Sequence, residues 1–179
     1  MLPHFNVLSL GAYFLIHFLT CFANVSNRTI DDTYGDAVTG FIPIYTSASW
    51  NVGQNCSWCS VRPDPNQAFD SSWHDITYND GDEPPSVALE FTGTAIYLFS
   101  IVPNTAATVP SESSINVINL RFILDGVPVG TYAYTMDNSS TIEYSVPVLS
   151  LENLVNEPHT LVAEPNAPSL FLLDRAIYT

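Results

Sequence analysis

The stretch that most constrains the fold is residues 86–102, which read SVALEFTGTAIYLFSIV. Its two apolar segments, 87–91 and 94–102, are separated by the Thr92-Gly93 pair. Neither segment has a helical period, and both are rich in β-branched and aromatic residues, which suit strands. The stretch therefore predicts two strands that form either the central hairpin or a corner of a β-sandwich.

Most of the chain repeats this pattern of short apolar segments separated by turn residues. No segment carries apolar residues at i, i+3, i+4 and i+7 over three turns, although residues 150–158 could hold one helical turn. Asp125-Gly126 is a strong hairpin signal, because both residues tolerate positive φ. The pattern predicts an all-β protein, an antiparallel β-sandwich of the jelly-roll type. The other expected strands are 28–32, 41–45, 72–79, 115–124, 127–135, 142–149, 159–163 and 170–178, the last of them central in its sheet.

Length and charge limit the classes of partner. The chain has 179 residues, 46% of them apolar, which is enough for one domain with a packed core. It has 18 acidic residues against four arginines and no lysine, for a net charge of −14. Such a charge opposes binding to nucleic acid and to anionic membranes, and it permits calcium. Its simplest consequence is solubility.

The N-terminal segment predicts export. Residues 7–22 are almost wholly apolar, and Cys21-Phe22-Ala23 places small residues where a signal peptidase needs them. We expect a signal peptide at 1–23 and a single secreted domain at 24–179 with no membrane span. An uncleaved anchor is the alternative, and it would place the domain at the cell surface. Export is supported by N-glycosylation sequons, the best placed of which begin at Asn27, Asn55 and Asn138.

Cys56 and Cys59 form a Cys-x-x-Cys motif. A redox motif and half of a zinc site are alternatives, but no second cysteine pair, closely spaced histidine pair or βαβ pattern accompanies this one. In an oxidising compartment, a structural disulfide that closes a tight loop is the favoured interpretation. Because the loop is short, its main effect would be on local shape.

Four fragments follow one another in a known order. They are FTGTAIYLF at 91–99, FILDG at 122–126, PHTL at 158–161 and LFLLDRAIYT at 170–179. Together they resemble the galactose-binding-like jelly-roll domains of fungal secreted and cell-surface proteins. The resemblance implies the fold more firmly than an activity, because one fold hosts many functions. Many such proteins continue into a Ser-rich stalk and a membrane helix. The resemblance therefore also implies that this chain could be a shortened relative of a membrane-anchored protein.

The acidic turn, residues 31–36, is the candidate metal site. Asp31, Asp32 and Asp36 offer the hard oxygen ligands that calcium prefers. The resemblance implies a structural calcium near the first and last strands, which would add Asp174. The alternative is a turn whose carboxylates are solvated or hydrogen-bonded locally.

Asp174 also has a structural interpretation. In a regular strand, Asp174 and its neighbour Arg175 point to opposite faces and cannot pair. We therefore expect Asp174 to meet backbone amides or a charge near the first strand, with Arg28 as a candidate.

The tryptophans are the candidate ligand-binding residues. A sugar site needs an exposed aromatic ring beside polar groups, and Trp50, Trp58 and Trp73 could provide it. Trp73 alternates with polar residues on its strand, which favours a core position. Trp50 and Trp58 lie in a polar loop at 47–65, either as a binding surface or as a plug over the sandwich.

Signals for catalysis are weak. The chain has no G-x-S-x-G motif, and His74 and Asp75 are strand neighbours on opposite faces. We expect no enzyme but a secreted module that recognises carbohydrate or a cell-wall or surface component. A structural or adhesion module that binds proteins and has no sugar site is the alternative, with a hydrolase behind both. Recognition predicts that Trp50 or Trp58 is exposed beside polar groups, whereas a spacer predicts that all three tryptophans are buried.

Overall fold

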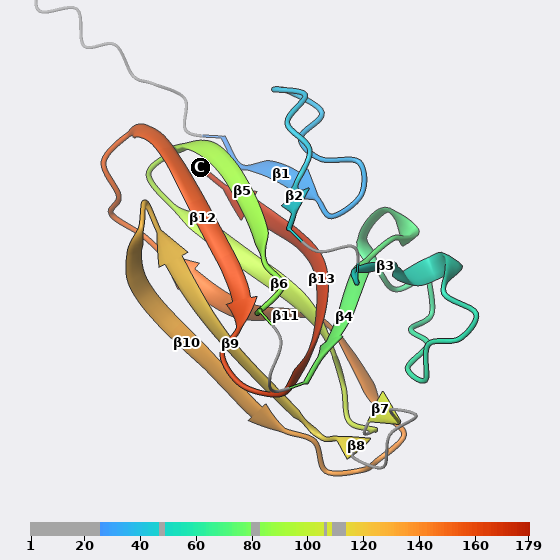
Figure 1. Cartoon of the computed structure of the whole chain (residues 1–179). Coiled ribbons are helices and arrows are strands. Elements are labelled where there is room, and N and C mark those ends of the chain that lie inside the picture. Colours follow the sequence, from blue (N-terminus) through green and yellow to red (C-terminus); the bar gives the residue numbers. More distant parts are fainter. Residues whose placement is uncertain (1–25, 47–48, 80–82, 106, 109–113) are drawn as a thin grey trace, which may run out of the picture.

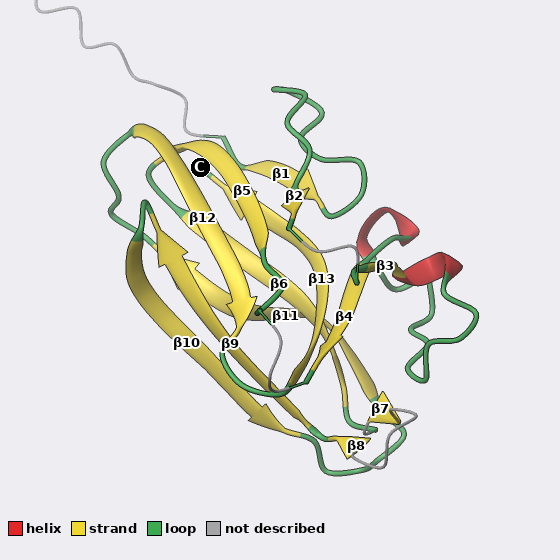
Figure 2. Ribbon diagram, viewed as in Figure 1, coloured by secondary structure: helices red, strands yellow, loops and turns green. Residues whose placement is uncertain are grey.

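Two antiparallel β-sheets stacked face to face make up the fold (Figures 1 and 2). The computed structural model describes residues 26–46, 49–79, 83–105, 107–108 and 114–179. Sheet A has the strand order β11 (Ile142–Leu151), β6 (Ile96–Pro103), β13 (Ser169–Tyr178), β4 (His74–Tyr78) and β3 (Asn51–Val52), with β1 (Arg28–Asp31) also paired to β13. Sheet B has the order β10 (Val127–Thr135), β9 (Val117–Leu124), β12 (Glu157–Pro165), β5 (Val87–Gly93) and β2 (Ile44–Tyr45).

The connections between the long strands are those of a jelly roll. From β4 to β13, successive long strands alternate between the two sheets, except where β9 and β10 form a hairpin within sheet B. The resulting orders, β11-β6-β13-β4 and β10-β9-β12-β5, are those of two interlocked Greek keys. The prediction of an antiparallel jelly-roll β-sandwich is confirmed.

The stretch at 86–102 forms a corner. Strand β5 pairs with β12 and β2 in sheet B, whereas β6 pairs with β11 and β13 in sheet A. The two strands therefore belong to opposite sheets. The corner is confirmed and the hairpin alternative is wrong.

The predicted turn between β9 and β10 is also confirmed. Asp125 has φ 51° and Gly126 has φ 79°, and Leu124 pairs directly with Val127 across the turn. Two consecutive residues with positive φ characterise the two-residue turns whose twist matches that of the strands.

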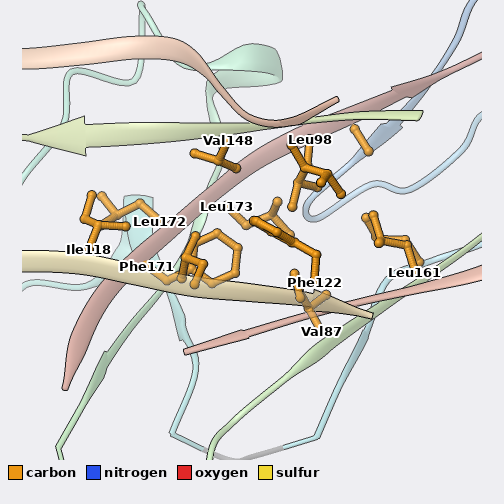
Figure 3. Packing of buried hydrophobic residues seen from close by; sticks show 14 of the residues in the cluster. Val87, Leu98, Ile118, Phe122, Val148, Leu161, Phe171, Leu172 and Leu173 are labelled. Atoms are coloured by element: carbon orange, nitrogen blue, oxygen red, sulfur yellow. The ribbon is translucent and has the colours of Figure 1, made fainter. Parts of the chain in front are cut away.

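The core lies between the sheets and consists of aliphatic and aromatic side chains together with Met136 (Figure 3). Strand β13 contributes most to it, because residues 169–174 are all buried, and it lies between β6 and β4 as expected for a central strand. Each fully buried large apolar side chain contributes roughly 1.5–3 kcal/mol. Among the largest fully buried side chains are Leu98, Ile118, Phe122, Leu161 and Phe171.

Several short elements differ from the sequence predictions. The expected strand at 41–45 shrinks to β2, because Pro43 cannot donate a ladder hydrogen bond. The region expected to be loop, 47–65, holds β3 and the one-turn 3-10 helix η1 (Gly53–Asn55). A second one-turn 3-10 helix, η2 (Phe69–Ser71), lies between this region and β4. Two further short strands, β7 (Ala107–Thr108) and β8 (Ser114–Ile115), pair with each other. The helical turn considered for 150–158 is wrong, because β11 extends to Leu151 and β12 begins at Glu157.

The predicted signal peptide at 1–23 lies outside the described residues. Among the residues that are described, no helix has the length and apolar character needed to cross a bilayer. Asn27, Asn55 and Asn138 are all exposed, as glycosylation requires.

Candidate ligand-binding site

A cavity of about 260 Å³ lies where the long loop between β3 and β4 meets strands β4 and β13. Figure 1 shows this loop beside β4, on the outside of the sandwich. Asp75 pairs with both Asn51 and Leu172, and Thr77 pairs with Leu170, so these residues share one face of sheet A. We call the cavity the disulfide-loop pocket; it is lined by Asn51, Trp58, Cys59, Ser60, Val61, Asp75, Thr77, Leu170 and Leu172.

The outer wall of the pocket is held by a disulfide. Cys56 and Cys59 are bonded, with their Cα atoms 5.4 Å apart, which confirms the predicted pairing. The Arg62 guanidinium closes the same turn, since it donates to the carbonyl oxygens of Ser57 and Cys59. Trp58 lies between the two cysteines, with 76% of its surface exposed. The turn therefore presents an indole ring to solvent at the rim of the pocket.

The other two tryptophans pack within the protein. Trp73 is 2% exposed, and a Cβ atom added at Gly53 would lie 1.9 Å from its Nε1 atom, so only glycine fits there. The Trp50 ring packs edge-on against Phe171, with ring centroids 5.6 Å apart, and tilted against Tyr45 at 5.0 Å. Of the three predicted tryptophans, only Trp58 lines the pocket.

The charged group of the pocket is the Asp75 carboxylate, which is 5% exposed. Asn51 Nδ2 donates a hydrogen bond to Asp75 Oδ1 at 2.9 Å. The Cys59 sulfur lies 3.6 Å from both carboxylate oxygens, but as a disulfide sulfur it has no proton to donate. Burial raises the pKa of the Asp75 carboxyl, and the hydrogen bond from Asn51 opposes that rise.

The acidic turn is built differently, because the protein itself supplies donors to its carboxylates. Asp31 Oδ1 accepts hydrogen bonds from the backbone amides of Thr33 at 2.9 Å and Tyr34 at 2.6 Å. Asp32 accepts hydrogen bonds from the hydroxyls of Ser72 and Thr33, both at 2.7 Å, and lies 2.6 Å from His74 Nδ1. Burial raises the pKa of Asp31 to about 6, and the adjacent Asp32 charge adds to that rise.

Asp36 has its own partners within the protein. Its carboxylate accepts hydrogen bonds from the Tyr178 hydroxyl at 2.6 Å, the Val38 amide at 2.7 Å and the Thr39 hydroxyl at 2.8 Å. Burial alone would raise its pKa, but these hydrogen bonds together lower it.

Asp174 pairs with its sequence neighbour, so the prediction that these two residues cannot meet is wrong. Arg175 Nη1 lies 2.5 Å from Asp174 Oδ2, because a β-bulge between Leu173 and Arg175 interrupts the alternation of side chains. The expected backbone amide is present, since Phe69 N donates to Asp174 Oδ1 at 2.9 Å. The cationic partner is thus Arg175 and not Arg28.

The structure brings only part of the predicted calcium site together. Asp31 and Asp32 both contact the Ser72 hydroxyl, whereas Asp36 and Asp174 bind separate partners. Within the described ranges, no group of three or more His, Cys, Asp or Glu residues is arranged to hold a metal ion. Calcium binding by Asp31, Asp32, Asp36 and Asp174 stays a prediction.

Comparisons with known proteins give the fold context only. No family model matches the chain, and a search of curated proteins finds no relative. An exo-β-1,3-galactanase from Phanerochaete chrysosporium has a TM-score of 0.48 and 12% identity over 86% of this chain and 29% of its own. The carbohydrate-binding module CBM36, in complex with calcium and xylotriose, has a TM-score of 0.43 and 9% identity over 86% of this chain and 98% of its own.

A family two carbohydrate esterase from Clostridium thermocellum is a third similar structure. Its TM-score is 0.42, with 15% identity over 75% of this chain and 30% of its own. The chain thus spans less than a third of either enzyme. Likeness at this level assigns neither a family nor an activity, so the galactose-binding-like family stays a prediction.

Sequence reasoning missed most of the residues that line the pocket. The alternation of the strand places Asp75 and Thr77 on one face with Trp73, but nothing in the sequence gives these two residues a role. Asn51 and Val61 lay in the predicted loop without any distinguishing feature. The available signal was the alternation at 73, 75 and 77, which places a carboxylate and a hydroxyl on the face opposite Ile76.

A second hollow, of about 410 Å³, lies at the other end of the sandwich and has a mixed lining. It combines Arg28 and His159 with Glu90. Of its aromatic residues, Phe91 and Tyr178 are buried and Phe41 is half-buried. His159 contacts Asp125 Oδ2 at 2.7 Å and the Val155 carbonyl oxygen at 2.8 Å, so both ring nitrogens are engaged. With no exposed ring among these, this hollow is the weaker candidate site.

Proposed function

We propose that the chain is a non-catalytic carbohydrate-recognition module and that its binding site is the disulfide-loop pocket. The observation that carries the proposal is Trp58, an indole ring 76% exposed at the rim of a cavity that holds the buried Asp75 carboxylate. A sugar ring offers an apolar C–H face for an aromatic ring and hydroxyl groups for polar side chains. Pockets that combine an apolar lining with a few convergent polar groups are the usual form of such sites.

The polar groups of the pocket have hydrogen-bonding capacity left for a ligand. An ionised carboxylate offers about four acceptor positions. Asn51 takes one of them, and the Trp73 indole N–H lies close enough to take at most one more. The side-chain carbonyl oxygen of Asn51 adds an acceptor. The Thr77 hydroxyl can both donate and accept a hydrogen bond. Leu170 and Leu172 provide the apolar part of the lining. The pocket can therefore hold a ring that is polar at its edge and apolar on its face.

The composition of the lining supports binding without catalysis. Asp75 is the single titratable group among the described residues that line the pocket, since Cys59 is in a disulfide. Glycoside hydrolysis needs two carboxyl groups that flank the scissile bond, and a serine or threonine nucleophile needs a neighbouring base. The alternative of a spacer with all tryptophans buried does not fit the exposure of Trp58.

We also infer that the protein acts outside the cell. The disulfide requires an oxidising compartment, and the exposed sequons at Asn27, Asn55 and Asn138 are accessible to the glycosylation machinery. Together with the predicted signal peptide, these features support a secreted protein that meets glycans or another cell-wall or surface component.

A glycan array followed by calorimetry on the best ligand tests the proposal. We expect Trp58→Ala to lower the affinity at least about tenfold, because an aromatic ring that the ligand covers is a typical binding hot spot. Tyr34→Ala is the matched control, since Tyr34 is also an exposed aromatic (62%) but does not line the pocket. The proposal is overturned if no glycan binds, or if Trp58→Ala binds as tightly as the parent protein.

A further inference from the structure

Among the residues that the structure describes, no cationic side chain forms an ion pair with the Asp75 carboxylate. Four ion pairs connect described residues, namely Asp32–His74, Glu164–Arg121, Asp125–His159 and Asp174–Arg175, and Asp75 is in none of them. The basic side chains nearest to it in the sequence and on the disulfide turn have other partners. His74 contacts Asp32, and Arg62 donates to loop carbonyls.

A buried carboxylate without a counter-ion is costly, because desolvation is repaid only by a compensating charge or by several hydrogen bonds. The raised pKa of Asp75 reflects that cost. A ligand that brings a positive charge into the pocket would stabilise the ionised carboxylate, whereas an anionic ligand would be repelled by it and by the net charge of −14.

The rim of the pocket favours the same kind of charge. An indole face attracts a cation, and tryptophan is the best of the aromatic side chains for this purpose. Trp58 and Asp75 line one cavity, so one bound group can contact both side chains.

The size of the pocket limits the rest of the ligand. Its volume of about 260 Å³ lies just below the range of about 300–1,000 Å³ that is typical of pockets for drug-sized molecules. Such a space suits a single sugar ring, as at the end of a chain, rather than several linked residues.

We propose that the disulfide-loop pocket selects a terminal sugar residue that carries a free, protonated amino group. This inference rests on the proposed carbohydrate-binding function and names the class of sugar. The ammonium group binds the Asp75 carboxylate, and the C–H face of the ring stacks on Trp58.

Calorimetric titration with three sets of methyl β-glycosides tests the proposal. The sets are glucosamine and galactosamine, their N-acetyl derivatives, and glucose and galactose. Each of these monosaccharides carries at most one positive charge, which limits nonspecific electrostatic attraction to the acidic protein. At pH 6, where a sugar amine is protonated, we expect at least one amino sugar to bind roughly tenfold more tightly than its acetylated and hydroxyl counterparts.

The variant Asp75→Asn should remove this preference, so that an amino sugar binds no more tightly than its acetylated and hydroxyl counterparts. Glu90→Gln is the matched control, because it removes the same charge from an exposed position outside the pocket, and it should retain the preference. If Asp75→Asn does not fold, the parent protein still gives the answer. Raising the pH to 9 deprotonates the amine and should abolish the preference.

The outcomes separate the two proposals. Equal affinities for the three kinds of sugar, or an unchanged preference in Asp75→Asn, would overturn the amino-sugar inference. Neutral sugars that bind in a Trp58-dependent manner would leave the proposed function intact. Absence of binding by every glycan would sink the proposed function itself.

Discussion

The acidic turn and the disulfide-loop pocket both contain buried carboxylates, but they use them in opposite ways. Asp32 contacts two hydroxyls and an imidazole of the protein. Asp75 accepts a hydrogen bond from one amide and faces a cavity. The acidic turn thus uses its carboxylates to hold its own loop, whereas the pocket retains capacity for another molecule. A concentration of acidic residues in a sequence is therefore a poor guide to a site unless their donors are known.

The largest expected difference is in the free energy of unfolding. Asp32→Ala should lower it by about 3 kcal/mol or more, because the Ser72 and Thr33 hydroxyls and the His74 ring lose their partner in a buried place. Asp75→Ala should cost less than about 1 kcal/mol, because it also removes an unpaired buried charge. Urea unfolding of both variants measures the difference. Equal losses would show that the two regions do not differ in this way.

The pH dependence of stability should separate the regions next. Asp31 keeps its proton up to about pH 6 when folded, against an ordinary pKa of 3.8, so the folded state binds more protons in that interval. Stability therefore falls as the pH rises from about 4 to 6, and the change in pKa corresponds to roughly 3 kcal/mol. Asp31→Asn, whose side-chain oxygen can still accept from Thr33 and Tyr34, should remove this fall.

Thermal or urea unfolding at intervals between pH 3.5 and 7 measures the effect. Asp64→Asn serves as a control of opposite sign, because hydrogen bonds from Asn66 lower the pKa of exposed Asp64. Because the lowered pKa makes the parent protein slightly more stable as the pH rises, the substitution of Asp64 should remove this small increase in stability. The interpretation fails if Asp31→Asn and the parent protein have the same pH profile.

The next expected effect on stability comes from the disulfide, and it is smaller than the effects expected for Asp32 and Asp31. Replacement of both Cys56 and Cys59 by serine should cost about 2 kcal/mol at most, because the bond closes a very short loop. The free energy of sugar binding should weaken by more than the free energy of unfolding does, because Cys59 forms a wall of the pocket and the bond positions Trp58. Calorimetry measures the change in affinity, and urea unfolding measures the change in stability. Unchanged affinity would show that the pocket does not depend on the bond.

The sequence predicted the elements that depend on local pattern. The two strands within 86–102, the buried strand β13 and the Asp125-Gly126 turn follow from alternation, apolar content and positive φ, which neighbouring residues determine. The sequence left a hairpin and a corner open for 86–102, because the distant strands β11, β12 and β13 decide between them. Strand β3 was missed because its two residues pair only with β4, which lies more than twenty positions later in the chain. The Asp174–Arg175 pair was missed because a bulge changes the side-chain alternation, and no residue type marks that bulge.

The tryptophans show the same limit at the site. Trp50 and Trp58 lie in one polar loop, yet the first packs on Phe171 and the second is exposed. What separates them is the tertiary environment. Trp50 directly precedes the edge strand β3, whereas the disulfide turn holds Trp58 away from the sheet. Residue type left both a binding surface and a plug open for these two rings, and it could not tell one ring from the other.

The central position of β13 has a consequence for how the protein is made. This strand pairs with β1, β4 and β6, so sheet A joins residues from near both ends of the chain. A ribosome delivers β13 after every other strand of the sandwich, and until then three strands of sheet A lack a neighbour. Sheets assembled from such distant segments fold slowly and expose unpaired edges in the meantime. Sheet A therefore cannot be completed until β13 has been synthesised.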